Sequence, residues 1–160
     1  MDVSTQGPTR TEFRAFVHDV EPQLLDALVA TYGPADGREA TVDALSWAWE
    51  HWDRLDGVAN KVGYLYRVGQ SATRRFAARG LPLADSHASS SRLPDVEPAL
   101  VPALADLSDQ QRTIVLLVHA FDWSQTDVAA LLEITPSTVR EHLRRALERL
   151  RHDLEVNDAH

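Results

Sequence analysis

The chain has 160 residues, no cysteine and a formal net charge of −8 at pH 7. The lack of cysteine excludes disulfide frameworks and thiolate metal sites, and no apolar run approaches the roughly 20 residues of a transmembrane helix. The amino-terminal residues also lack the basic and then apolar pattern of a signal peptide. We therefore expect a soluble cytoplasmic protein that does not contact a membrane.

The first part of the chain predicts a long amphipathic helix followed by a turn. Between residues 12 and 32, apolar side chains recur with the i, i+3, i+4 spacing of one helix face. Pro22 lies inside this segment, and because proline lacks the N–H that a helix uses, we expect a kink or a break near residues 20–21. The sequence Gly-Pro-Ala-Asp-Gly at residues 33–37 predicts the turn.

Two further helices are expected over residues 38–54 and 60–79. One face of the first is expected to consist of Val42, Leu45, Trp49 and Trp52. We expect Trp49 to be buried, because indole rings are large apolar groups. Three tryptophans within six residues cannot share one helix face, so the burial of Trp47 and Trp52 stays open. These helices predict a first domain over residues 10–79.

The composition changes between residues 80 and 103, which contain four prolines and a serine-rich run. Proline interrupts helices and serine supplies little apolar surface, so we expect a flexible linker here. Strand patterns are nearly absent throughout. The predicted fold is therefore all-α, with two small helical domains, residues 10–79 and 104–155, joined by this linker.

The second domain contains three helix starts with capping residues. Ser108 with Gln111 fits a capping box, in which a side-chain hydroxyl accepts a hydrogen bond from a backbone N–H of the first helical turn. Ser124 repeats this pattern, and Thr135 followed by Pro136 opens the last helix, because proline is tolerated at the first helical position. Two helices separated by so short a turn predict a helix-turn-helix.

The last helix is amphipathic and basic. Its apolar residues fall within about 100° on a helical wheel, and they are Val139, Leu143, Ala146, Leu147, Leu150 and Leu154. Residues 135–151 contain five arginines and two glutamates, a local charge of +3, and residues 67–79 contain four arginines and no acid, a local charge of +4. Such local patches in an acidic chain indicate weak, salt-sensitive DNA binding by the free protein.

The polar side of the last helix is the predicted DNA-binding face. The residues that would face base edges are Ser137, Thr138, Arg140, Glu141 and Arg144, and Thr135 is a further DNA-binding candidate at the start of the helix. Arginine suits guanine, and glutamate can accept a hydrogen bond from cytosine. Arg145 and Arg149 are better placed for phosphates, and in the first domain Arg67, Arg74 and Arg75 are further DNA-binding candidates.

The sequence at residues 107–117 and 127–147 resembles region 4 of bacterial RNA polymerase sigma factors of the extracytoplasmic-function type, within the sigma-70 family. The N-terminal helices resemble region 2 of the same family more loosely. The resemblance implies a transcription initiation factor that directs RNA polymerase to promoters, with region 4 on the −35 element and region 2 on the −10 element and the polymerase. Promoter DNA and core RNA polymerase are the implied partners, and an anti-sigma protein is a further candidate.

The resemblance also assigns a polymerase-binding surface, formed by Glu39, Asp43, Trp49 and Trp52. Four departures stand out. Val42 occupies the place of a common glutamine, and Tyr64 and Gln70 replace a tryptophan and an asparagine of the family pattern. Glu133 stands at the turn where glycine is usual, in a position that often needs a left-handed backbone; we expect this to cost on the order of 1 kcal/mol.

No catalytic pattern is present. The chain lacks a glycine-rich phosphate loop, a nucleophile elbow and paired carboxylates, and no two of its seven histidines have the i, i+4 spacing of a helical zinc site. We expect no enzyme activity, metal, cofactor or small-molecule substrate. Two alternatives stay open, namely a sigma-derived stand-alone DNA-binding regulator without polymerase contact, and a helical protein-interaction module.

Overall fold

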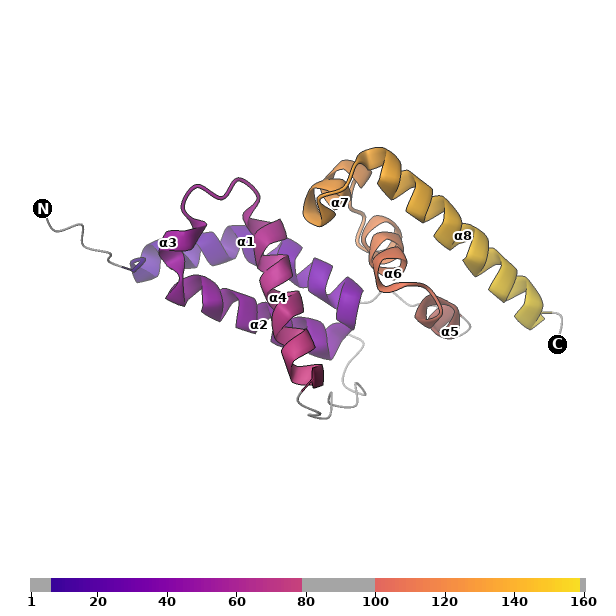
Figure 1. Ribbon diagram of the computed structural model, residues 1–160, viewed down its shortest axis with the longest axis horizontal. Helices are drawn as coiled ribbons and strands as arrows, with labels where there is room; N and C mark the ends of the chain where they lie inside the picture. Colours follow the sequence, from indigo (N-terminus) through magenta and orange to yellow (C-terminus); the bar gives the residue numbers. More distant parts are fainter. Residues whose placement is uncertain (1–6, 79–99, 159–160) are drawn as a thin grey trace, which may run out of the picture. The chain divides into compact units, whose positions relative to one another are not determined.

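The computed structural model describes residues 7–78 and 100–158, and every regular element in these two ranges is helical (Figure 1). The all-α prediction is thereby confirmed. The chain divides into two compact units, residues 1–86 and 87–160. Most of the predicted linker, residues 80–99, lies outside the described residues. Within the described ranges, no helix is both long enough and apolar enough to span a bilayer.

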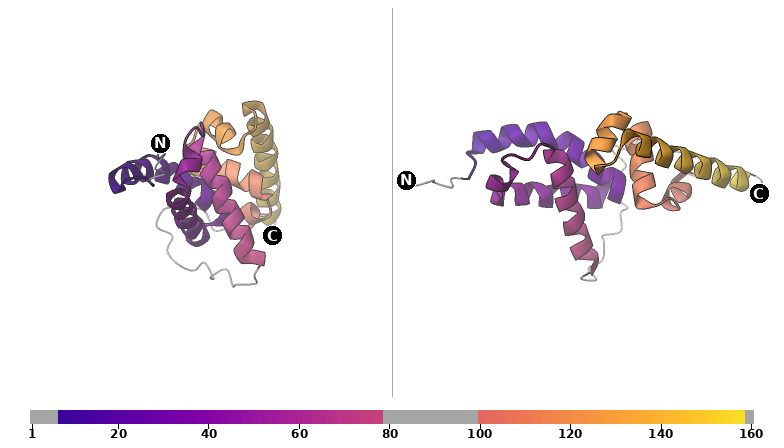
Figure 2. Two further views of the ribbon diagram at one scale, coloured as in Figure 1. Left: turned by 60° about the vertical axis from the view of Figure 1, so that its left-hand side comes forward. Right: turned by 45° about the horizontal axis from the view of Figure 1, so that its top comes forward.

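The N-terminal unit packs three long helices around one apolar core. Helices α1 and α2 lie side by side, and α4 packs against both (Figures 1 and 2). The bounds are α1 Arg10–Tyr32, α2 Pro34–Glu50, α3 Trp52–Leu55 and α4 Lys61–Ala78. Among the described side chains of this unit, the largest fully buried ones are Leu24, Leu28, Leu55 and Leu65.

Helix α1 is continuous through Pro22, so of the kink or break predicted near residues 20–21, the break is wrong. Thr9 and Glu12 form a capping box that fixes its start: Thr9 Oγ1 accepts a hydrogen bond from Glu12 N at 3.2 Å, and Glu12 Oε2 accepts one from Thr9 N at 2.9 Å. Pro22 itself is exposed, whereas Leu24 and Leu28 beyond it are fully buried. Burial of these leucines offsets the cost of proline, since most helix stability in proteins comes from tertiary packing.

Helix α2 begins four residues earlier and ends four residues sooner than predicted. Gly33 has φ 89° and ψ 170° and alone makes the turn from α1, because glycine reaches positive φ without steric cost. Pro34 then occupies the first turn of α2, where its missing N–H is harmless. At the other end, His51 interrupts the helix, and residues 52–55 form the separate helix α3.

The buried face of α2 is made of small residues, so the predicted face with Val42 and Trp49 is wrong. Its buried residues are Gly37, Ala40, Thr41, Ala44 and Ala48. A Cβ added to Gly37 would lie 2.6 Å from Val29 Cα, which shows how closely α1 and α2 approach. Val42 is 62% exposed and Trp49 is 43% exposed. The large apolar side chains lie outside the contact because the close contact has no room for them.

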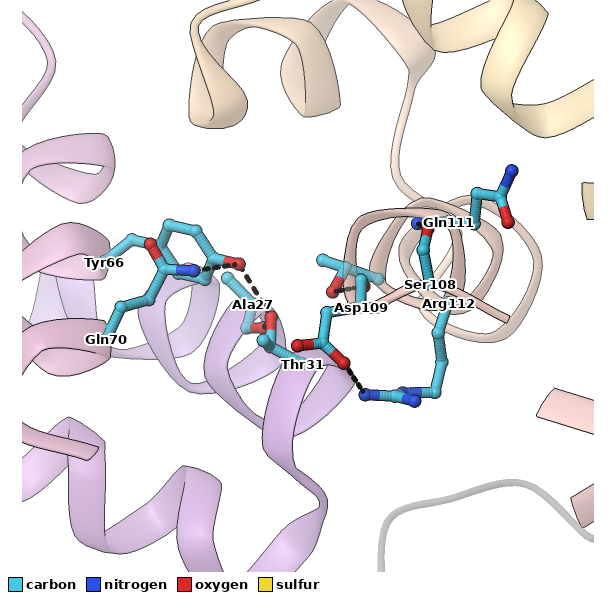
Figure 3. A network of polar contacts seen from close by, with 9 residues as sticks. Ala27, Thr31, Tyr66, Gln70, Ser108, Asp109, Gln111 and Arg112 are labelled. Atoms are coloured by element: carbon cyan, nitrogen blue, oxygen red, sulfur yellow. Dashed lines mark hydrogen bonds and ion pairs between the residues drawn. The ribbon is translucent and has the colours of Figure 1, made fainter. Parts of the chain in front are cut away.

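A polar network joins α1 to α4 inside this unit (Figure 3). The hydroxyl of Thr31 donates to Ala27 O at 2.9 Å, so the 2.7 Å contact between Thr31 Oγ1 and the Tyr66 hydroxyl is donated by Tyr66. Gln70 Nε2 in turn donates to the Tyr66 hydroxyl at 3.3 Å. Both Thr31 and Tyr66 are buried, and their pairing removes the cost of burying two hydroxyl groups.

The described part of the C-terminal unit, residues 100–158, consists of five helical segments. They are α5 Leu100–Ala105, α6 Asp109–Val115, the π-helix η1 Leu116–Ala120, α7 Gln125–Leu132 and α8 Pro136–Asp158. Helices α5, α6 and α7 all pack against α8, and the fully buried side chains include Ile114, Leu117, Val128 and Val139. This arrangement fixes one face of α8 inside the unit.

Helix α5 begins inside the range predicted as linker. Its residues Ala103 and Leu104 are buried, and Pro102 is accommodated because it lies in the first turn of the helix. Residues 100–103 therefore belong to the helical C-terminal unit. The π-helix η1 was also not predicted; Phe121 N donates to Leu116 O at 3.0 Å to close it.

We predict that Gly37→Ala destabilises the N-terminal unit by about 1–3 kcal/mol, the usual cost of overpacking, because the new Cβ meets the backbone of Val29. Gly7→Ala is the matched control, since no atom lies within 4 Å of a Cβ at that position. Urea denaturation of the full chain measures both. Equal stability of the two variants would contradict the close α1–α2 contact.

Candidate nucleic-acid interface

Two side-chain caps and one left-handed residue build the helix-turn-helix. Ser124 Oγ accepts a hydrogen bond from Asp127 N at 3.0 Å at the start of α7. Glu133 ends α7 with φ 56° and ψ 43°, which confirms the left-handed backbone expected there. Thr135 Oγ1 accepts from Thr138 N at 3.1 Å and opens α8. The turn between the helices is thus only residues 133–135.

Ser108 caps α6 in the same way, accepting a hydrogen bond on its Oγ from Gln111 N at 3.2 Å, beside the ion pair of Arg112 and Asp109 at 2.8 Å (Figure 3). The predicted cap at Ser108 is confirmed, whereas the second bond of the predicted capping box, from Ser108 N to the Gln111 side chain, is not among the contacts of the described residues. Helix α6 packs on α8, and its residues Thr113, Ile114 and Val115 are buried. The cap therefore fixes the start of a helix that supports the recognition helix.

One face of α8 is anchored in the core. Val139, Leu143, Ala146 and Leu150 are buried, as the helical wheel predicted, while Leu147 and Leu154 are only partly buried. Because a helix has a fixed rotation of 100° per residue, this burial directs the residues between them to the opposite, exposed side.

The first turn of α8 presents a cluster of hydroxyl groups. Thr135 Oγ1 lies 3.0 Å from Ser137 Oγ and 2.8 Å from Thr138 Oγ1. Ser137 is exposed and Thr138 is half-buried. Hydroxyl donors beside the free N–H groups of a helix N-terminus favour an anion, so this end of α8 suits a DNA phosphate.

The exposed arginines of α8 fall into two groups. Arg144 pairs with Glu141 at 2.8 Å and with Glu148 at 2.7 Å, and Arg145 pairs with Glu141 at 2.9 Å. Arg140 and Arg149 are also exposed and form no ion pair with another described residue. The hydrogen bond from Arg144 lowers the pKa of Glu141, and the same bond raises the pKa of Arg144. The carboxylate of Glu141 therefore stays ionised at neutral pH.

The N-terminal unit has an open pocket with a volume of about 380 Å³ on the basic side of α4. It is lined by Trp47, Tyr64, Arg67, Val68 and Ser71. The ring of Trp47 stacks on His51 at 4.5 Å and lies 5.5 Å from the ring of Tyr64. The pocket places Arg67 beside two aromatic rings, which sequence reasoning did not predict. The i, i+4, i+7 spacing of Tyr64, Val68 and Ser71 on α4 is the signal that indicates it.

The other two DNA-binding candidates of this unit, Arg74 and Arg75, also lie on α4. Arg74 is exposed on α4. Arg75 lies in the same helix, but its side chain is outside the described part of the chain. Neither residue lines the pocket beside Arg67.

The polymerase-binding candidates lie along α2 and at its end. Glu39 and Trp49 are exposed, whereas Asp43 and Trp52 are half-buried. Trp49 packs edge-on against Phe13 at 4.9 Å, and Trp52 packs edge-on against Phe16 at 5.1 Å. The expectation that Trp49 belongs to the core is therefore wrong, because its ring lies on a surface aromatic cluster with α1.

The capped turn, the anchored α8 and its exposed arginines define a helix-turn-helix protein. The family model "Sigma-70, region 4" matches residues 99–150. The RNA polymerase sigma-E factor of Streptomyces avermitilis is 32% identical over 159 residues, which cover 92% of this chain and 87% of that protein. The sigma-E factor of Streptomyces antibioticus is 32% identical over 136 residues, 78% of this chain and 74% of that protein.

Solved structures show the same fold. The sigma factor RpoE from Bartonella quintana, in a co-crystal with the anti-sigma factor NepR, has a TM-score of 0.62 and 23% identity, covering 91% of this chain and 98% of that one. CnrH, in complex with the cytosolic domain of CnrY, has a TM-score of 0.56 and 19% identity, covering 92% of this chain and 90% of that one. The chain belongs to the bacterial RNA polymerase sigma factors of the extracytoplasmic-function type. It is therefore a transcription initiation factor and not an enzyme.

We predict that Glu133→Gly makes the C-terminal unit more stable than Glu133→Ala by about 1 kcal/mol, because only glycine adopts φ 56° without steric cost. Both variants remove the same side chain, so their difference isolates the backbone strain. A gap in Tm of roughly 4–8 °C between them is expected for a unit of this size. Equal Tm values would show that the turn is not strained.

Proposed function

We propose that this sigma factor recognises promoters with both units, the C-terminal unit contacting the −35 element and the N-terminal unit contacting core RNA polymerase and the −10 element. The observation that supports the proposal most is the exposed polar face of α8, opposite the buried Val139 and Leu143. A recognition helix places residues of its N-terminal half against base edges in the major groove. The protein would act in the cytoplasm, where RNA polymerase and the chromosome are.

On duplex DNA, we assign the base contacts to Arg140 and Arg144, because arginine matches the two acceptors of guanine. Thr135, Ser137 and Thr138 form the hydroxyl cluster at the helix start and suit a phosphate. Arg145 and Arg149 lie further along the exposed side and suit the phosphate backbone. With so few basic contacts in an acidic chain, tight binding would require the polymerase as well.

For the −10 element, we assign the pocket of Trp47 and Tyr64. Aromatic rings stack with unpaired bases, and a nearby arginine holds the backbone of the strand. Arg67 lines the same pocket, and Arg74 lies further along α4. The open volume of about 380 Å³ is sufficient for a group of the size of a nucleobase.

For core RNA polymerase, we assign the exposed side of α2 and the start of α3. Its charged residues are Glu39 and Asp43, and its aromatic residues are Trp49 on α2 and Trp52 on α3. Val42 is 62% exposed between these residues. An exposed large apolar side chain beside charged ones is typical of a protein interface. An anti-sigma protein is a further partner that we propose, since RpoE is bound to NepR in the co-crystal described above.

The double variant Arg140→Ala/Arg144→Ala should reduce sigma-dependent transcription at least about tenfold. Each bidentate contact between an arginine and a base supplies a large part of the free energy that distinguishes the correct base from a wrong one. The assay combines core polymerase, the full chain and a genomic fragment that the unsubstituted chain transcribes. Arg151→Ala, which removes an exposed arginine from the same helix, should leave transcription within about twofold. Unchanged transcription by the double variant, with intact helical content by circular dichroism, would refute the assigned recognition face.

The amount of the Val42→Arg variant retained on immobilised core RNA polymerase should be about tenfold or more below that of the unsubstituted chain. The substitution places a long charged side chain in the centre of the proposed interface. Val156→Arg is the matched control, since Val156 is also exposed, at 48% against 62% for Val42. If the unsubstituted chain itself is not retained, the alternative of a stand-alone regulator without polymerase contact is correct. Equal retention of both variants would move the interface away from α2.

A further inference from the structure

The arginines of the recognition face are not equally available, because Glu141 holds two of them. Glu141 Oε1 accepts hydrogen bonds from Arg144 Nη2 at 2.8 Å and from Arg145 Nε at 2.9 Å, and its Oε2 accepts one from Arg144 Nε at 3.2 Å. Glu148 Oε1 accepts a bond from Arg144 Nη1 at 2.7 Å. All three nitrogens of Arg144 and both oxygens of Glu141 are thus engaged within the helix.

This network changes the effective charge of the face. Residues 135–151 have five arginines and two glutamates, a formal charge of +3. The network contains two arginines and both glutamates and is therefore neutral as a group. The whole excess of +3 belongs to Arg140, Arg149 and Arg151, which form no ion pair with another described residue.

The network is also exposed, so it can open. The relative exposures of the side chains are 46% for Glu141, 55% for Arg144 and 63% for Arg145. Ion pairs at such sites are weak in water. A well-placed guanine or phosphate can therefore replace Glu141 as the acceptor, whereas a misplaced phosphate has to compete with a carboxylate that is already bonded.

We propose that Glu141 is a positioning residue that raises the DNA specificity of the recognition helix by withholding Arg144 and Arg145 from non-specific phosphates. This inference rests on the proposed DNA-binding function of α8. It changes the role expected for Glu141 from the sequence, since both its oxygens accept bonds from arginines and are not left for cytosine. Pre-bonded guanidinium groups also lose less freedom on binding, which favours the matched sequence.

Three glutamate-to-glutamine substitutions change the net charge of α8 equally but remove different ion pairs. Comparing them separates the effect of the arginine–glutamate ion pairs on DNA binding from the effect of net charge. Glu141→Gln removes both ion pairs of Glu141, so that Arg144 keeps an ion pair with Glu148 alone and Arg145 keeps none with a described residue. Glu148→Gln leaves Arg144 still bonded to Glu141. Glu155→Gln alters an exposed glutamate of α8 that forms no ion pair with another described residue. Each variant removes one negative charge from the same helix.

The test measures binding of the full-length chain to a labelled duplex of random sequence over a series of salt concentrations. Each arginine that gains a phosphate contact steepens the slope of log K against log salt by about 0.9. We expect Glu141→Gln to steepen the slope by roughly 1–2 and to raise low-salt affinity on the order of tenfold, with Glu148→Gln intermediate and Glu155→Gln close to the unsubstituted chain. Equal slopes for the three variants would overturn the proposal, because only net charge would then matter.

A second measurement reports specificity directly. In transcription with core polymerase, random duplex DNA is added as a competitor, and the amount that halves the product is determined. Glu141→Gln should need several-fold less competitor than Glu155→Gln. Equal amounts for the two variants would contradict the proposal. The proposed function of α8 itself would instead be contradicted if the double variant Arg140→Ala/Arg144→Ala bound DNA as well as the unsubstituted chain does. The two failures are therefore distinguishable.

Discussion

The C-terminal unit depends on the burial of one face of α8. Val139 and Ala146 are fully buried, and α5, α6 and α7 pack against α8. Since the rotation of a helix is fixed, this burial determines which side chains remain outside. The same constraint requires a tight connection, which Glu133 supplies at φ 56°. The capped start at Thr135 then presents the hydroxyl cluster and the arginines of the helix on the exposed side.

The N-terminal unit obeys the opposite constraint, because its helices approach closely through small residues. Gly37 lies against the backbone of Val29, and this contact leaves the bulky residues of α2 outside the core. Val42 and Trp49 are exposed as a result. The small residues on the buried face of α2 therefore explain why the surface that we propose for core RNA polymerase is exposed.

Much of the fold was predictable because local signals agree with tertiary packing. The caps at Ser108, Ser124 and Thr135 and the apolar stripe of α8 are visible in the sequence, and each is present in the structure. The buried face of α2 was not predictable, because alanine and glycine give no strong apolar periodicity. The pocket beside Arg67 also escaped prediction, since it joins α2 to α4, and sequence spacing describes only one helix at a time.

We propose that this one chain gives core RNA polymerase its choice of promoter through two separate contacts with DNA. The most direct measurement maps the 5′ ends of transcripts made by core polymerase on fragmented genomic DNA, with and without the chain. We expect start sites that depend on the chain and that share two short upstream sequence elements at nearly constant spacing. Start sites that are the same with and without the chain, or that share only one element, would contradict it.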